Sequence, residues 1–297
     1  MKRLLVLMLL WLPVQAHAAL NVFACEPEWA ALAREIGGAE VRVYSATTAL
    51  QDPHRIEARP SLIAQMRRAN LVVCTGADLE IGWLPVLLRE AGNAAVQPGR
   101  PGCFEATRFV PLLDKPARLD RAEGDVHAAG NPHIHTDPRN ILRVGAALTE
   151  QLAAVDPANA AAYRSRGQDF ATRWQAAIAR WEARATPLKG MAVVTQHKSF
   201  PYLFNWLGLR DVAVLEPRPG VEPSVGYLAR VAEQLKTTPA KMVLRAAYQS
   251  PRPANWLAER AGIPALALPY TVGGNDRARD LFGLFDDTLD QLLKATR

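Results

Sequence analysis

The feature that most constrains the fold is an alternation of short apolar runs with longer helical patterns, which occurs twice along the chain. In the first third, strands are expected at 20–25, 41–46 and 71–75, and helices at 28–36, 61–69 and 79–91. The alternation resumes near residue 190, with strands expected at 191–195, 212–215, 242–246 and 265–268, and helices near 199–207, 224–235, 255–261 and 279–294. Because parallel strands need crossover connections, this order predicts two small α/β lobes, each built on a parallel sheet.

A long helical region separates the two alternating parts. It is rich in Ala, Arg and Gln from Pro138 onward and is interrupted at Asp156-Pro157. From Pro157 to about Ala185 only Gly167 disfavours a helix, and a helix of that length would reach roughly 40 Å at about 1.5 Å per residue. We therefore divide the chain into an N-terminal α/β lobe (19–137), a helical region with a long inter-lobe helix (138–186) and a C-terminal α/β lobe (187–297).

The N-terminus has the pattern of a secretory signal peptide. Lys2 and Arg3 precede an apolar run, and the segment ends in Ala16-His17-Ala18. The run is too short for a membrane helix, so residues 1–18 are interpreted as a removed leader of a monomeric periplasmic protein. Loss of the two cations lowers the formal charge from +6 to about +4, and this modest, dispersed excess argues against a nucleic-acid partner.

Three cysteines remain, which allows one disulfide and leaves an odd thiol in an oxidising compartment. Cys25 and Cys74 each end an apolar run of strand length, whereas Cys103 does not. If the two runs are neighbouring parallel strands, Cys25 and Cys74 could form the disulfide. Buried free thiols are the alternative.

Histidines follow prolines at two places, His54 after Pro53 and His133 after Pro132. The proline ring restricts the backbone, so both corners suggest ligands presented on stiff turns, with ordinary core or surface histidines as the alternative. Ligands of open parallel sheets bind beyond the carboxyl ends of the strands. His54 follows the second expected strand, His197 follows the strand at 191–195, and Asp276 follows the last strand.

The spacing of these residues is regular. His54 and His133 are 79 positions apart, and so are His197 and Asp276. Equal spacing is expected if two pseudo-symmetric lobes each supply two ligands to one ion. Coincidence is the alternative.

Four separated motifs resemble the zinc and manganese substrate-binding proteins of bacterial ABC importers, the periplasmic zinc-uptake solute-binding family. They are Asp52-Pro53-His54 with Arg59-Pro60-Ser61, Asn131-Pro132-His133 with Asp137-Pro138, His197-Lys198-Ser199-Phe200-Pro201-Tyr202, and Glu222-Pro223-Ser224. The resemblance covers essentially the whole mature chain in order. It implies two α/β lobes joined by a rigid helix, with a metal between them, and it places the family's ligands on His54, His133, His197 and Asp276.

The chain departs from the family pattern at several positions. The long His- and acid-rich loop of many zinc members is reduced to residues 119–127, His135 stands where Trp is frequent, and the last motif lacks the usual Asp-Pro or Asp-Ser pairing after Asp276. His127 is interpreted either as a residue that captures metal transiently or as an ordinary loop histidine. His135 is a possible further ligand, with a histidine behind the ligands or a solvent-facing histidine as the alternative. Glu222 is interpreted as a helix cap or an acceptor behind a ligand.

Three imidazoles and one carboxylate suit Zn²⁺. In the resembling family a carboxylate at the third position accompanies manganese, so His197 favours zinc, although copper is not discriminated by ligand type. We therefore predict a high-affinity protein that captures Zn²⁺ and delivers it to an ABC permease, with loading by a metallochaperone left open. A manganese-binding member or a metal-dependent adhesin of the same fold is the alternative.

A secreted zinc hydrolase is disfavoured. Such an enzyme needs an open coordination position and a nearby general base. His54-Arg55-Ile56-Glu57 is not the His-Glu-x-x-His motif, and neither Gly-x-Ser-x-Gly nor a Cys/His nucleophile pattern occurs. The sequence therefore predicts a binding protein and not an enzyme.

Overall fold

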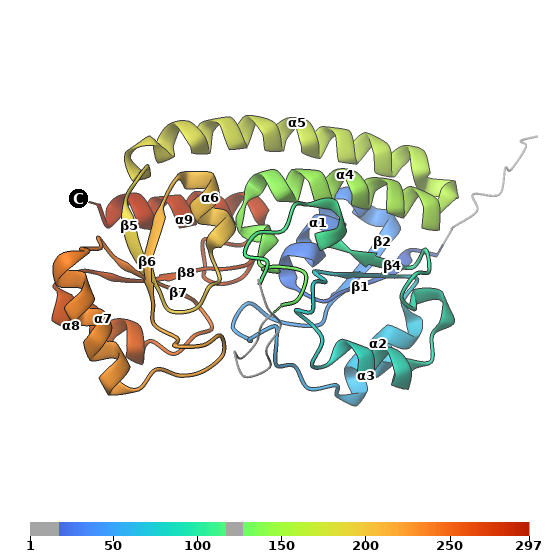
Figure 1. Ribbon diagram of the computed structural model, residues 1–297. Coiled ribbons are helices and arrows are strands. Elements are labelled where there is room, and N and C mark those ends of the chain that lie inside the picture. The colour runs from blue at the N-terminus through green and yellow to red at the C-terminus, as the bar shows by residue number, and fades with distance from the viewer. Residues whose placement is uncertain (1–17, 117–126, 297) are drawn as a thin grey trace, which may run out of the picture.

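The computed structural model describes residues 18–116 and 127–296, and it contains two lobes, each built on a four-stranded parallel sheet (Figure 1). The N-terminal sheet has the order β2-β1-β3-β4, from β1 (Leu20–Ala24), β2 (Val41–Ser45), β3 (Leu71–Cys74) and β4 (Cys103–Glu105). The C-terminal sheet has the order β6-β5-β7-β8, from β5 (Ala192–Thr195), β6 (Arg210–Val214), β7 (Val243–Ala246) and β8 (Ala265–Leu268). The predicted pair of α/β lobes is confirmed. Residues 1–17 of the expected leader lie outside the described residues.

Strand β4 was not predicted from the sequence. It has three residues, Cys103 to Glu105, and joins the sheet through pairing with β3. A segment this short carries no repeated apolar pattern. Its position depends on the neighbouring strand and not on its own sequence.

Helices cover both faces of each sheet (Figure 1). In the N-terminal lobe they are α1 (Pro27–Gly37), α2 (Pro60–Arg68) and α3 (Leu84–Ala91), and in the C-terminal lobe α6 (Pro201–Leu207), α7 (Val225–Thr237), α8 (Arg252–Ala261) and α9 (Leu281–Lys294). Alternate strand residues face different helices: Val22 packs in the same core cluster as α1, whereas Phe23 packs with α2 and α3. Helix α3 begins later than expected because residues 77–83 form turns, in which the N–H of Leu79 donates to the carbonyl of Gly76 and that of Trp83 donates to the carbonyl of Glu80.

Two helices in the middle of the chain join the lobes. They are α4 (Pro138–Val155) and α5 (Ala160–Ala185), and α5 lies along both lobes (Figure 1). The 26 residues of α5 correspond to about 39 Å. Trp174 of α5 donates to the carbonyl of Pro138 at 2.8 Å, and Trp181 donates to Asp286 of α9 at 2.8 Å. One buried core therefore runs from one sheet through α5 to the other.

The structure joins Cys25 and Cys74 in a disulfide at the carboxyl ends of the neighbouring strands β1 and β3. Their Cα atoms are 4.8 Å apart, and Ala24 and Val73 pair directly before them. Cys103 is a half-buried free thiol. The disulfide closes the part of the chain that contains His54. Within the described residues, no helix is both long and apolar enough to cross a membrane.

Candidate metal centre

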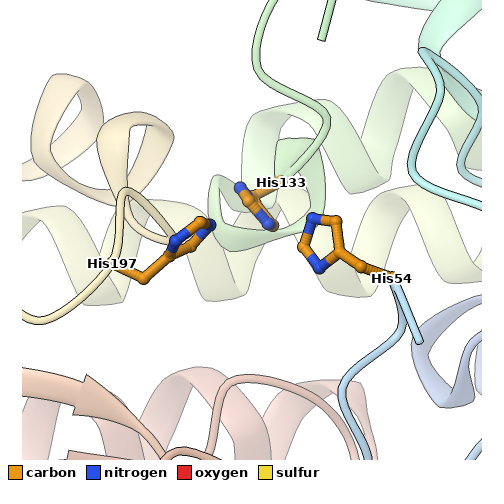
Figure 2. Close-up of side chains that lie close together, drawn as sticks. All are labelled: His54, His133 and His197. Carbon is orange, nitrogen blue, oxygen red and sulfur yellow. The ribbon is translucent and has the colours of Figure 1, made fainter. Parts of the chain in front are cut away.

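Three histidines from separate parts of the chain point toward one another between the lobes (Figure 2). His54 lies in the loop after β2, His133 in the connection before α4, and His197 directly after β5. One ring nitrogen of each lies within 4.8 Å of the others. The side chains of His54 and His197 are 9% and 8% exposed, and His133 is fully buried. This is the geometry of a site in which one ion would be shared by both lobes.

His54 and His133 are held by the same local device. Two residues before each stands an Asx side chain, Asp52 or Asn131, followed by a proline. The side-chain oxygen accepts from the backbone N–H of the histidine at 3.0 Å, and from its ring Nδ1–H at 2.7 Å for His54 and 2.8 Å for His133. An Asx turn thus fixes both the backbone and the ring of each histidine.

His197 is held by a residue distant in sequence. Its Nδ1 donates to Glu216 Oε2 at 2.7 Å, and the same oxygen accepts from the backbone N–H of Gly220 at 2.7 Å. Glu216 follows β6, the strand that pairs with β5. A further hydrogen bond joins the two lobes: Asn131 Nδ2 donates to the carbonyl of Lys198 at 2.9 Å.

These contacts determine which ring atoms are available. With Nδ1–H committed to an acceptor in all three rings, each neutral imidazole presents the lone pair of Nε2. The Nε2 atoms of His54 and His133 are buried and have no hydrogen-bond partner within the part of the chain that the structure describes. Burial, and then the neighbouring histidines His197 and His54, hold the pKa of His133 well below its usual value, which keeps this ring neutral and able to bind a metal.

Two carboxylates behind the histidines oppose the charge of a bound cation. Burial raises the pKa of the Asp52 carboxyl, but hydrogen bonds and the charge interaction with His54 outweigh it, so the pKa is lowered overall. Asp52 and Glu216 together supply two negative charges at the outer edges of His54 and His197. A divalent ion held by three neutral rings would therefore be balanced without a carboxylate among its ligands.

The structure does not bring Asp276 or Glu222 to this site. Asp276 is exposed on the turn after β8 and lies outside the group of metal-binding atoms, and its carbonyl accepts from Arg279 Nε. The turn begins at Gly273, whose φ is +90°, and directs this carboxylate to solvent. Glu222 is also exposed, and the cap of α7 is the side chain of Ser224, which accepts from the N–H of Tyr227. The acceptor behind His197 is Glu216, so the interpretation of Glu222 as that acceptor is wrong.

The two additional histidines lie in different surroundings. The ring of His127 is 5.3 Å from that of His54 and 6.4 Å from that of His133, and burial lowers the pKa of His127 to about 4. His135 is buried on the other side of His133. Its Nδ1 lies 3.2 Å from Glu28, and its Nε2–H donates to the carbonyl of Tyr270 at 3.1 Å, so both of its nitrogens face other groups.

A cleft of about 610 Å³ opens beside the histidines and is lined by residues of both lobes, among them His127, His133, His197 and Glu216. It gives an ion a route from solvent. The residues that sequence reasoning missed are Asp52 and Asn131 as ring acceptors, Glu216, and Tyr270. The repeated Asx-Pro-His pattern was a signal for the first two, whereas Glu216 and Tyr270 depend on strand pairing and carry no local signal.

Sequence comparisons with known proteins agree on one family. The sequence profile described as zinc-uptake complex component A, periplasmic (ZnuA), matches residues 22–295. Zinc-binding lipoprotein AdcA of Streptococcus pneumoniae serotype 4 is 24% identical over 84% of this chain and 49% of its own length, so the chain spans about half of that relative. The high-affinity zinc uptake system protein ZnuA of Bacillus subtilis is 24% identical over 83% of this chain and 76% of its own length. The manganese ABC transporter substrate-binding lipoprotein PsaA of Streptococcus anginosus is 22% identical over 91% of this chain and 90% of its own.

Solved structures show the same fold. A crystal structure of ZnuA superposes with a TM-score of 0.78 at 20% identity, covering 94% of this chain and all of that one. The substrate-binding protein FpvC of Pseudomonas aeruginosa in complex with Mn²⁺ gives a TM-score of 0.75 at 23% identity, covering 93% and 98%. The profile match extends over nearly the whole chain and both lobes. The chain belongs to the family of the periplasmic component A of zinc-uptake complexes.

Proposed function

We propose that this protein binds one Zn²⁺ through the Nε2 atoms of His54, His133 and His197 and delivers it to an ABC-type permease. The observation that carries the proposal is the convergence of three imidazoles, each oriented by an acceptor at Nδ1. Because His54 and His197 come from different lobes, binding of the ion ties the lobes together. After removal of residues 1–18, we expect a monomeric periplasmic protein that acts as a carrier and catalyses no reaction.

The donor set favours zinc over manganese. Three imidazole nitrogens are ligands of Zn²⁺ at about 2.0–2.1 Å, whereas Mn²⁺ prefers oxygen ligands. Manganese is the second candidate because one relative is named a manganese-binding lipoprotein and one solved neighbour holds Mn²⁺. Among residues 18–116 and 127–296, no carboxylate belongs to the group of converging atoms, which argues against manganese.

His127, which lines the cleft, can bind the ion before it reaches the three converging histidines. Its neutral ring lies against His54 and lines the same cleft as His133 and His197. We propose that it receives the ion first and then yields it to the three converging histidines. This role needs no change in the positions of His54, His133 or His197.

Competitive titration tests the choice of cargo. The purified mature protein is titrated with Zn²⁺ and with Mn²⁺ against a chromogenic chelator, and the bound metal is counted by elemental analysis. The proposal predicts one tight equivalent of zinc and much weaker manganese binding. Equal affinity for the two ions, or no tight zinc binding, would contradict it. Delivery is then tested by zinc-limited growth of cells that lack the gene and are supplied with either the wild-type protein or the His197→Ala variant.

A further inference from the structure

The turn after β8 presents Tyr270 to the metal centre in a strained conformation. Tyr270 has φ +61°, and the N–H of Thr271 donates to the carbonyl of Pro269 at 2.7 Å. A positive φ at the centre of such a three-residue turn is rare and costs about 1–3 kcal/mol for a residue other than glycine. Strain of this kind persists only where surrounding contacts impose it.

The contacts that impose this conformation come from the N-terminal lobe and from the connection before α4. The carbonyl of Tyr270 accepts from His135 Nε2 at 3.1 Å, and the hydroxyl of the next residue, Thr271, donates to Glu28. Glu28 also lies 3.2 Å from His135. His135 and Glu28 therefore clamp the turn, one at the carbonyl of Tyr270 and the other at the side chain of Thr271. His135 therefore stabilises the turn at Tyr270, a role that its sequence position near His133 did not indicate.

The clamp places the phenol ring beside His133 of the metal centre. The ring centroid of Tyr270 is 5.9 Å from that of His133 and 5.3 Å from that of Tyr248, in edge-to-face arrangements. Tyr270 is 5% exposed, and its Oη is buried with no hydrogen-bond partner among the described residues. A phenol carries its proton at neutral pH, so the Tyr270 hydroxyl is a hydrogen-bond donor.

A buried donor without an acceptor costs about 1–3 kcal/mol, and the metal centre has a position that can supply one. Three imidazoles leave one place open around a tetrahedral Zn²⁺. Since Asp52 and Glu216 already oppose the charge of the ion, the fourth ligand can be a neutral water molecule. We propose that Tyr270 is a positioning residue that hydrogen-bonds through Oη to a water molecule completing the coordination of the ion. This inference rests on the proposed zinc site and deepens it.

Tyr270→Phe tests the inference because it removes only the hydroxyl. We expect the metal-free variant to be as stable as the wild type or slightly more stable, since an unpartnered buried hydroxyl is lost. The variant should still bind one equivalent of zinc, with an affinity about 5–10-fold lower, the value of one hydrogen bond. The visible spectrum of the Co²⁺-loaded variant should differ from that of the wild type, because a ligand of the ion has lost its partner.

Two matched variants separate the alternatives. Tyr163→Phe removes a buried hydroxyl that bonds Asp156 at 2.7 Å far from the site, so it should leave zinc affinity and the Co²⁺ spectrum unchanged. His127→Ala tests the rival fourth ligand. If Tyr270→Phe matches the wild type in both readouts, or if His127→Ala alone changes the Co²⁺ spectrum, the inference is overturned while the zinc site stands. Absence of zinc binding by the wild type would instead overturn the proposed function.

Discussion

The two lobes share one topology but use equivalent positions differently. Strands β1 and β5 hold the equivalent, second place in their sheets. The residue after each strand donates its N–H to a carbonyl of the adjacent strand at 2.9 Å, Cys25 to Val73 and Gln196 to Leu244. The next residue is His197 in the C-terminal lobe but Glu26 in the N-terminal lobe. Where the C-terminal lobe presents the proposed ligand His197, the N-terminal lobe places the buried acid Glu26 beside a disulfide.

The acid at this position does not compete for the cation as a free carboxylate would. Glu26 accepts from Thr75 Oγ1 at 3.0 Å, and burial, followed by the nearby Glu80 and Glu28, raises the pKa of Glu26 well above its usual value. A neutral acid is a poor metal ligand. The N-terminal lobe supplies His54 from the loop after β2, whereas the corresponding loop after β6 supplies Glu216. Shared topology therefore does not imply symmetric ligands.

Removal of one ligand from either lobe should have the largest effect. Wild-type protein should gain about 4 kcal/mol of unfolding free energy when free zinc is a thousandfold above its dissociation constant. His54→Ala and His197→Ala should each lose most of this gain, because the ion needs donors from both lobes. Calorimetric unfolding with zinc or chelator measures it.

Glu26→Gln is the matched control for His197→Ala, since the two residues occupy equivalent positions. The Glu26→Gln variant should keep the full zinc-dependent increase in unfolding free energy. If Glu26→Gln loses it as His197→Ala does, the proposed difference between the lobes is wrong.

Loss of the disulfide should destabilise the N-terminal lobe by a similar amount. The bridge spans 49 residues, for which the loop-closure argument gives about 4 kcal/mol. Denaturant unfolding of the Cys25→Ser/Cys74→Ser double variant should show this loss, whereas Cys103→Ser should unfold like the wild type. An unchanged midpoint in the double variant would mean that the bridge adds no stability.

Neutralising the acceptors behind the histidines should have a smaller effect. Asp52→Asn and Glu216→Gln keep an acceptor for Nδ1–H but remove a negative charge, and each should lower zinc affinity about 10–100-fold. Asn131→Asp makes the opposite change behind His133 and should not weaken binding. Chelator competition on the three variants decides whether charge or orientation matters. If Asn131→Asp proved as harmful as the two neutral variants, the charge argument would fail.

The smallest net effect should appear in the pH dependence of the metal-free protein, because the contributions of two residues to the free energy of unfolding have opposite signs and largely cancel. His127 has its pKa lowered to about 4, below the unfolded value near 6.5, so the unfolded chain binds more protons between these values and the stability that His127 contributes falls as pH drops from 6.5 to 4. Glu80 has its pKa raised to about 7, so its contribution has the opposite sign and rises as pH drops from 7 toward 4.5.

Urea unfolding across pH 4–8 separates the two contributions. His127→Asn should lose less stability on acidification than the wild type, and Glu80→Gln should lose more. If both variants had the same pH profile, the prediction that His127 and Glu80 contribute to stability with opposite signs would be wrong.

The sequence was sufficient to predict the lobes and the long helix, and three of its four candidate ligands, His54, His133 and His197, lie together in the structure. Strand periodicity and the Pro-His corners are local signals, and the residues that carry them fold as expected. The equal spacing that paired Asp276 with His197 was misleading, because the ligand loops of the two lobes are not equivalent and Gly273 turns the chain before Asp276. Glu216 and the clamp on Tyr270 depend on contacts between distant segments, which no spacing rule reveals.

The most direct test of the account is X-ray absorption at the zinc edge on the loaded protein, which counts the imidazole ligands. His127→Ala should retain three imidazole ligands and one oxygen ligand at about 2.0–2.1 Å, and Asp276→Ala should be indistinguishable from the wild type. His197→Ala should have one imidazole fewer than the wild type. Loss of a ligand in Asp276→Ala, or an unchanged imidazole count in His197→Ala, would contradict a centre built from His54, His133 and His197.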